Sequence, residues 1–218
     1  MRPRCRRINM TAEEAKSASH VFLQSHKIQI NSGLPVIESI EDLVPQTAQA
    51  IARRCVILSH VIAVVGYGAD VRKLKDALTK FGLFEYASQK EQDLLNRASH
   101  SSQEKTDATW LAECVQSLAW CVNLVGMSPF RRCDDDLASH FPPPFSDPSA
   151  FINSVIARPL EEIYQQADLH YRLHWAGRNA RLTRVPSIAH EGLIGERRKG
   201  LDWAIGVEAD WDRMPDDT

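Results

Sequence analysis

The sequence lacks the cysteine patterns that build structural zinc sites. Five cysteines occur among 218 residues, with no Cys-x-x-Cys pair and no short Cys-to-His spacing. Unpaired thiols are typical of a reducing compartment, because small secreted domains usually carry disulfides. The cysteines therefore predict a cytoplasmic protein without a structural metal.

Long apolar runs and an excess of one charge are missing too. The run Cys55 to Val65 is shorter than the ~20 residues that a membrane helix needs, and residues 8–19 are too polar for a signal peptide. With 26 basic and 28 acidic residues, the net charge of −2 creates no global field toward nucleic acid or an anionic membrane. We expect a soluble protein with no membrane partner, and nucleic acid is disfavoured as a partner.

Motifs that bind phosphate groups or activate a nucleophile are also absent. The chain has no Gly-rich phosphate loop, no dinucleotide fingerprint and no Gly-x-Ser-x-Gly elbow. Gly66-Tyr67-Gly68 is interpreted as the end of a helix. We therefore expect no cofactor and find no complete set of catalytic residues.

Charge is uneven only at the two ends of the sequence. Four arginines lie within residues 2–7, and five acids lie within residues 208–217. Terminal charge runs are usually solvated, so we interpret the basic arm in this way, with a nucleic-acid contact as the alternative. Residues 1–40 are predicted to hold this arm, one helix and a connector, and residues 41–218 a single helical domain.

Apolar residues recur with the helical period along most of the chain. Thr11 and Thr106 or Asp107 are the expected caps of two of the helices. The predicted helices span about 11–27, 47–65, 70–81, 88–97, 108–125, 158–178 and 189–205. We predict an all-α, compact multi-helix domain around a central helix at about 158–178, since that segment has apolar residues on two sides.

Glu113 is the only charged residue between Leu111 and Val125, and it falls within an apolar arc of its helix. An unpaired buried carboxylate costs several kcal/mol. We therefore predict that Glu113 is buried and contacts an arginine or histidine of the 158–178 or 189–205 helix, as a paired core acid or a functional one.

The 158–178 segment combines acids, arginines and histidines at helical spacing. Asp168 and Arg172 are four residues apart and can form a pair within the helix. His170 and His174 have the same spacing, which zinc-binding histidines use, but Tyr171 replaces the Glu of the metalloprotease motif and no third ligand is apparent. We favour structural histidines over a metal site.

Three arginines are candidate partners for these acids. Arg172, Arg178 and Arg197 lie on or beside apolar stripes, and a guanidinium can hold a carboxylate bidentately. We interpret the groups as a buried ion-pair network that sets helix register. The alternative is a pocket in which surplus arginines bind an anionic ligand.

The acidic C-terminal segment carries a large apolar residue, Trp211. We expect residues 208–218 to fold back, to insert Trp211 against the central helix, and to bring Asp212 toward the arginines of the 158–178 or 189–205 helix. Burial of a tryptophan removes roughly 150–250 Å² from water, which can offset the ordering of several residues.

Several motifs together resemble the bacterial domain-of-unknown-function family 4272 over roughly residues 40–218. They are Arg53-Arg54, Trp110-Leu111-Ala112-Glu113, Leu118-Ala119-Trp120, the segment Asp168 to Ala176, the segment Glu196 to Trp203, Trp211-Asp212 and Asp217-Thr218. Asp202 departs from the family's Asn before the late Trp, a change that concerns one local hydrogen bond. The resemblance implies a mostly helical cytosolic protein and brings no catalytic mechanism with it.

Two functions follow as hypotheses. The first is a non-catalytic interaction or accessory protein that binds another protein, with the acidic tail and the Pro-rich 141–148 loop as exposed contacts. The second is a small-molecule (anion) binding protein or hydrolase. Its candidate residues are Glu113, His170 and His174 for catalysis and Arg172, Arg178, Arg197 and Asp212 for binding.

Overall fold

The computed structural model describes residues 10–215, and these residues form helices and no strand, which confirms the predicted all-α fold. The helices are α1 (Ala12–Ser25), α2 (Ala48–Val61), α3 (Val71–Lys80), α4 (Gln89–Leu95), α5 (Ser102–Cys121), α6 (Ser149–Ser154), α7 (Leu160–Thr183) and α8 (Glu191–Ile205). Shorter turns are the π-helix η1 (Ile62–Gly66) and the 3₁₀ turns η2 (Phe84–Tyr86), η3 (Leu137–His140) and η4 (Trp211–Arg213). The basic arm at residues 2–7 and the residues Asp216, Asp217 and Thr218 lie outside the described range.

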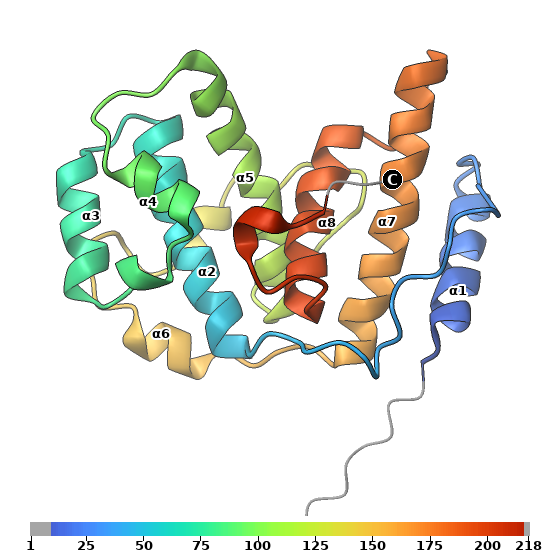
Figure 1. Ribbon diagram of the computed structural model, residues 1–218, viewed down its shortest axis with the longest axis horizontal. Helices are drawn as coiled ribbons and strands as arrows, with labels where there is room; N and C mark the ends of the chain where they lie inside the picture. Colours follow the sequence, from blue (N-terminus) through green and yellow to red (C-terminus); the bar gives the residue numbers. More distant parts are fainter. Residues whose placement is uncertain (1–9, 216–218) are drawn as a thin grey trace, which may run out of the picture.

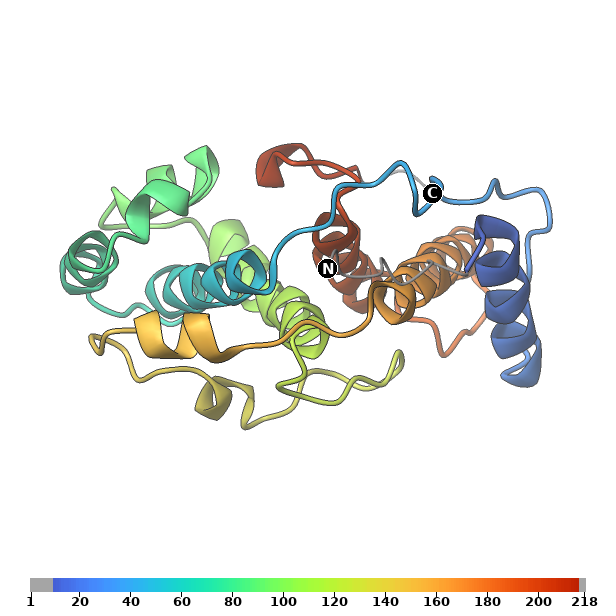
Figure 2. The same cartoon turned by 90° about the horizontal axis from the view of Figure 1, so that it is seen from below.

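The long helices lie side by side in one row. From one edge to the other the order is α3, α2, α5, α8, α7 and α1 (Figures 1 and 2). The 26–47 connector, α4 and η4 cover one face of the row, and the 126–148 segment and α6 cover the other (Figure 2). α7 is therefore packed between α1 and α8, which explains why its sequence is apolar on two sides.

Helix starts follow the capping residues, and this corrects one predicted boundary. The helix expected over 108–125 begins at Ser102, because Ser101 and Glu104 form a capping box, and neither Thr106 nor Asp107 acts as its cap. It ends at Cys121, two residues before Asn123 takes a left-handed backbone with φ of 60°. Thr11 caps α1 with Glu14 as expected.

One further boundary and one further helix differ from the sequence-based prediction. α7 continues five residues beyond 178, to Thr183, and ends with Arg184 in the left-handed region. α6 is an additional helix, which the sequence pattern does not predict because its six residues contain too few apolar positions to show a helical period.

Where α8 packs closely against α5 and α7, the residue at the contact is a glycine, which has no side chain. A Cβ at Gly200 would lie 2.3 Å from Ser117 Oγ on α5. A Cβ at Gly177 on α7 would lie 2.8 Å from the backbone oxygen of Ala189, just before α8. Since helix axes approach only as closely as the side chains between them allow, these glycines bring α5, α7 and α8 together.

One stretch is long and apolar enough to cross a membrane by composition. It runs from Ala48 to Gly66, with a mean hydropathy of 1.5, because η1 extends α2 without a break. In this fold 56% of the stretch is buried, and it packs against α5. The stretch therefore serves as a core helix of the row.

Residues 207–215 fold back onto the helices. Trp211 is only 4% exposed and meets Trp203 of α8 edge to face at 5.5 Å, while the Arg54 guanidinium of α2 lies 4.8 Å from its ring centre. The burial of Trp211 is thus as predicted, but its partners belong to α8 and α2 and not to α7. The predicted contact of Asp212 with arginines is wrong, because Asp212 accepts a hydrogen bond from the Lys90 backbone at 3.0 Å at the start of α4.

Candidate functional site

The predicted burial and pairing of Glu113 are confirmed. Arg197 of α8 donates to Glu113 Oε2 from Nε at 3.0 Å and from Nη2 at 2.7 Å, and both residues are buried. The same arginine donates to the carbonyls of Ser128 and Arg131, and Glu113 accepts from the Cys133 backbone N–H at 3.0 Å. The pair therefore joins α5 to α8 and also anchors the loop at 128–133.

Asp168 and Arg172 form the second pair, within α7 as their spacing predicts. Arg172 donates from Nε and Nη2 to the two carboxylate oxygens of Asp168 at 2.9 and 2.8 Å, and both residues are completely buried or nearly so. Nη2 also donates to the Pro35 carbonyl at 3.2 Å. This pair attaches the connector after α1 to the middle of α7.

A third buried pair was missed by the sequence reasoning. Arg54 of α2 donates to Glu91 Oε2 at 2.7 Å and to the Tyr86 carbonyl at 3.2 Å. The signal was present, because Arg54 lies on the same helix face as Ile51 and Leu58 and is buried with them. Arg54, Arg172 and Arg197 thus each hold one acid and the backbone of a segment outside the long helices.

The two histidines of α7 have different surroundings. His170 is fully buried, donates from Nδ1 to the Gln166 carbonyl at 2.8 Å, and burial lowers its pKa to about 4. His174 is also buried, but its Nδ1 lies 3.4 Å from Nη1 of Arg198 on α8. Across residues 10–215 no group of three or more His, Cys, Asp or Glu side chains is arranged to hold a metal ion.

Arg178 lies half-buried near the C-terminal part of α7. The Arg181 side chain donates two hydrogen bonds to Glu191 and lowers the pKa of that carboxyl, and the charge of Arg178 adds to this effect. Arg178 thus contributes charge at the start of α8 and has no direct contact with Glu113 or Asp168.

The residues proposed as one cluster are distributed over separate places. Glu113 and Arg197 lie at the α5–α8 crossing, Arg172 binds Asp168, and His170 is enclosed within the core. Of the proposed residues, His174 and Asp212 line a substantial hollow. The candidate site is therefore this pocket, and the sequence predicted two of its residues, His174 and Asp212. The sequence reasoning missed Arg198 and Lys199, although both belong to the motif from Glu196 to Trp203.

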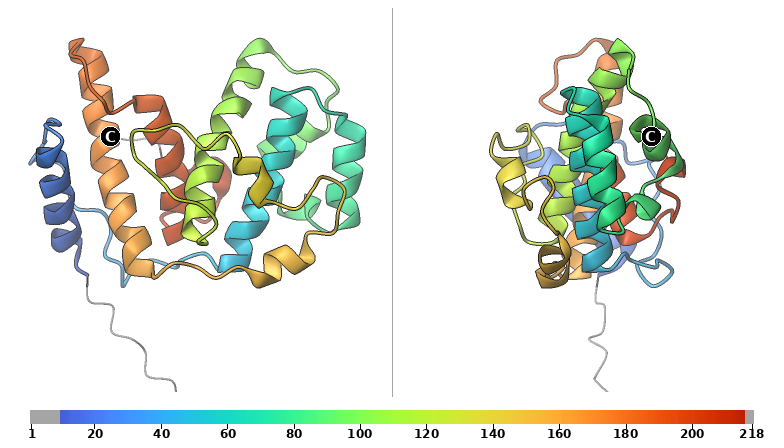
Figure 3. Two further views of the ribbon diagram at one scale, coloured as in Figure 1. Left: turned by 180° about the vertical axis from the view of Figure 1, so that it is seen from behind. Right: turned by 90° about the vertical axis from the view of Figure 1, so that its left-hand side faces the viewer.

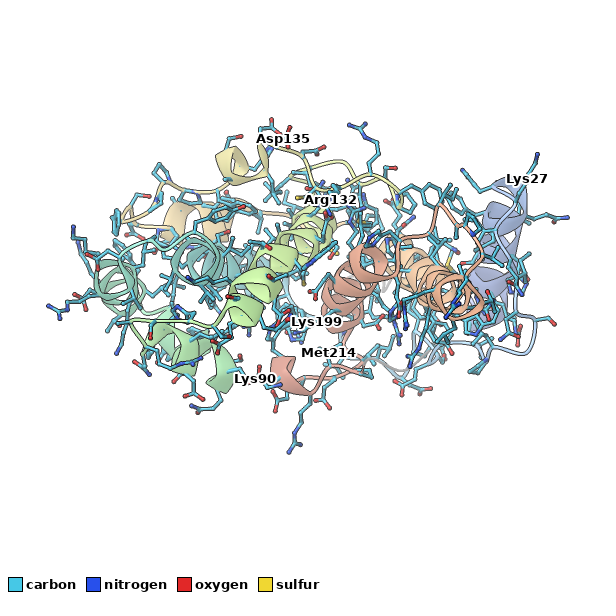
Figure 4. The ribbon with its side chains drawn as sticks, turned by 90° about the horizontal axis from the view of Figure 1, so that it is seen from above. Lys27, Lys90, Arg132, Asp135, Lys199 and Met214 are labelled. Carbon is cyan, nitrogen blue, oxygen red and sulfur yellow. The ribbon has the colours of Figure 1, made fainter. Side chains whose placement is uncertain are left out.

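The pocket has a volume of about 560 Å³ and lies between α4, α7, α8 and η4. Its lining consists of Lys90, His174, Arg181, Glu191, Gly192, Gly195, Glu196, Arg198, Lys199, Trp211, Asp212, Met214 and Pro215. Lys90, Lys199 and Met214 are seen together beside α8 in Figure 4, on the opposite side of the row from Arg132 and Asp135. A second hollow of about 500 Å³ shares Lys90, Glu196 and Lys199 and continues along α5.

Chemically, this pocket presents cations and acids side by side. Arg181 and Glu191 form one ion pair and Arg198 and Asp202 another, the latter with Nε and Oδ2 3.0 Å apart. The Lys199 ammonium lies 4.6 Å from the centre of the Trp211 ring. Such a pocket suits a ligand that carries charge and has the size of a small molecule or a few residues.

A family model described as Domain of unknown function (DUF4272) matches residues 15–214. The matched region begins within α1, closer to the N-terminus than residue 40, where the resemblance was expected to start. Neither the curated proteins nor the solved structures contain a match to this chain. The suspected family is confirmed, and its description assigns no activity.

Proposed function

The chain belongs to the family described as Domain of unknown function (DUF4272), and from this premise we propose that it is a non-catalytic interaction or accessory protein of the cytoplasm. Its candidate acids and arginines support a binding role over hydrolysis. Glu113, Arg172 and Arg197 are occupied in internal pairs and line no substantial pocket. A hydrolytic site needs such groups beside a space for substrate.

The observation that carries this proposal is the tip between α7 and α8, residues 181–188, which we call the α7–α8 tip. All eight residues are exposed. Three of them are large and apolar: Leu182 is 65%, Val185 59% and Ile188 53% exposed. The end of α7 projects past the start of α8, so the segment that joins the two helices lies at the outer limit of the fold (Figures 1 and 3).

The charge around this tip indicates the chemistry of the partner. Residues 178–190 contain three arginines and no acid, and because Arg181 pairs with Glu191, Arg178 and Arg184 carry the net positive charge beside the tip. Exposed apolar side chains beside a single sign of charge are typical of protein-binding surfaces. We therefore propose that the α7–α8 tip binds an acidic segment of another protein that also carries apolar side chains.

Two other expected contacts differ in their exposure. Phe145 in the Pro-rich 141–148 loop is 55% exposed, so this loop remains available as a secondary contact. The described part of the acidic tail is less available, because Trp211 is buried and Asp212 binds α4.

The test is site-specific photo-cross-linking in the native host. A benzophenone amino acid at Val185 should give a discrete cross-linked product, which Arg184→Glu should abolish because it reverses the charge beside the apolar contact. The same amino acid at Ile156, which is 75% exposed but remote in sequence, is the matched control. A product that survives Arg184→Glu, or equal products at both positions, would contradict the proposal.

A second experiment distinguishes a contact with a membrane from a contact with a protein. The purified protein is mixed with vesicles containing one third phosphatidylserine and floated on a gradient. Binding that depends on Leu182 and Arg184 would assign the tip to a lipid surface and overturn the protein partner.

The compartment and the domain limits are part of the same proposal. Cys55, Cys114, Cys121 and Cys133 are free, in accord with a reducing cytoplasm. We propose that residues 41–218 form one domain to which residues 1–40 are appended. The described part of that appendage packs on α7, where Gln165 Nε2 donates to Ser19 Oγ at 3.1 Å.

Small-molecule binding is the second candidate function. It is favoured by the 560 Å³ pocket on α8, whose lining shares one residue, Arg181, with the α7–α8 tip. The charges at the floor and the rim of this pocket decide which class of ligand it fits.

A further inference from the structure

The floor of the pocket on α8 is formed by two buried, basic side chains. His174 is 5% and Arg198 6% exposed, although both line the hollow. The Arg198 guanidinium is oriented by Asp202 at 3.0 Å and lies 4.9 Å from the Tyr171 ring centre. A guanidinium held in this way is preorganised, so a ligand need not order it upon binding.

Two glycines of α8 keep the space above this floor open. Gly192 and Gly195 both line the pocket. A Cβ at Gly195 would lie 3.1 Å from Nε2 of His174, so any other residue there would press on the imidazole. The absence of side chains at these positions leaves a hollow where the helix surface would otherwise be filled.

Charge at the rim is also oriented by neighbouring groups. Lys199 lies over Trp211, and the Lys90 ammonium donates to the Asp212 carbonyl at 3.3 Å. The pocket also covers Glu191 and Gly192 in the first turn of α8, where the helix dipole favours an anion. Glu196 and Asp212 at the same rim disfavour a phosphate, which places two negative charges on one group, and leave a carboxylate group, which places one charge there, as the better match.

The geometry points to a carboxylate-binding site with Arg198 and His174 at its floor and Lys199 at its rim. Two sources can supply this chemistry. One is a free small-molecule carboxylate. The other is the side chain of Asp216 or Asp217, which follow the lining residue Pro215 in the sequence and are within roughly 10 Å of chain length from it.

The experiment compares the full chain with a chain truncated after Pro215 and with the Asp216→Asn/Asp217→Asn variant. Isothermal titration calorimetry is performed with succinate and with the peptide acetyl-Met-Pro-Asp-Asp-Thr. If the source is a small molecule, succinate binds the full and truncated chains with equal affinity. If the source is the chain itself, the peptide binds the truncated chain and the Asn variant at least tenfold more tightly than the full chain.

Either calorimetric result supports the carboxylate site if the measured affinity depends on the residues of the pocket. Lys199→Gln in the truncated background should weaken binding about fivefold, because a partly exposed charge pair is lost. Lys105→Gln, an exposed lysine outside this pocket, should leave the affinity unchanged. Absence of binding of both probes to both chains, or binding that is insensitive to Lys199→Gln, would overturn the proposal.

This proposal does not depend on the α7–α8 tip. Failure of the cross-linking at Val185 leaves the calorimetry unaffected. Conversely, loss of the carboxylate site leaves the tip as the candidate contact surface.

Discussion

Glu113 on α5 and Arg197 on α8 form a buried ion pair in which Oε2 and Nη2 lie 2.7 Å apart. Together they bind three backbone groups of the loop that follows α5, at Ser128, Arg131 and Cys133. Buried ion pairs alone contribute little net stability, because desolvation offsets the attraction. Here the pair also satisfies backbone groups that would otherwise be buried without partners, which gives it a structural role beyond its own charge.

Replacing Glu113 with Gln should lower the free energy of unfolding by about 3 kcal/mol, because Arg197 keeps its buried charge without an opposing one. Urea unfolding followed by circular dichroism measures this change. Glu162→Gln is the control, since its carboxylate is 54% exposed and lies 3.6 Å from Arg158. The control should change by less than ~1 kcal/mol. Equal unfolding midpoints for wild type and Glu113→Gln would contradict the role of the pair.

Gly200→Ala should destabilise the protein by about 1–3 kcal/mol through overpacking at the α5–α8 crossing. Its Cβ would lie 2.3 Å from Ser117 Oγ and 3.1 Å from the Cys114 carbonyl. Gly192→Ala on the same helix meets nothing closer than 3.6 Å, so stability should stay unchanged or rise by up to ~1 kcal/mol. Thermal unfolding of the two variants side by side measures the difference, and equal melting temperatures would show that the crossing tolerates a wider spacing.

Trp211→Ala should cost about 3 kcal/mol, because it removes a buried ring from Trp203 and Arg54. For a chain of this length that corresponds to a fall in melting temperature of roughly 6–12 °C. Truncation after Gly206 should have a similar effect and should expose apolar surface to a fluorescent dye. Arg213→Ala, whose side chain is 78% exposed, should leave the melting temperature within ~2 °C. A truncated chain that melts as wild type does would refute the docking of this segment.

Because of the titration of His170, the free energy of unfolding should decrease as pH falls from 6.5 toward 4. Burial lowers its pKa from 6.5 to about 4, and the nearby charge of Arg197 acts in the same direction. In this window the unfolded chain binds a proton that the folded chain does not, so the free energy of unfolding decreases by roughly 3 kcal/mol as pH falls. Above pH 6.5 the imidazole is neutral in both states and its contribution is constant.

His170→Leu removes this titration and should flatten the dependence on pH by that amount, while the exposed His140→Leu should keep the wild-type dependence. Urea titrations at pH 7, 6, 5 and 4 provide the comparison. Parallel curves for wild type and His170→Leu would show that His170 is hydrated in the folded protein.

The all-α class and most helix positions follow from the sequence, because the 3.6-residue period and the local caps depend only on neighbours along the chain. The Asp168–Arg172 pair is a consequence of the same period. A charged residue inside an apolar arc also has to find a partner, so the burial and pairing of Glu113 follow from the pattern of its own helix. The same reasoning applied to Arg54 would have predicted that it is buried and paired, although not that its partner is Glu91.

The partners across helices depend on the tertiary structure. The helical period predicts which face of α8 is apolar. Gly200 and Gly177 decide which helices approach α8 and how closely. For that reason Arg197 meets Glu113 while Arg172 stays on its own helix, and Trp211 packs on Trp203 and Arg54 and not on α7. The pocket on α8 likewise depends on residues from α4, α7 and the C-terminal segment, which extend from Lys90 to Pro215 and so over more than a hundred positions of the chain. Contacts of this kind arise from how helix surfaces fit together, and that fit has no signature in the local pattern of residues.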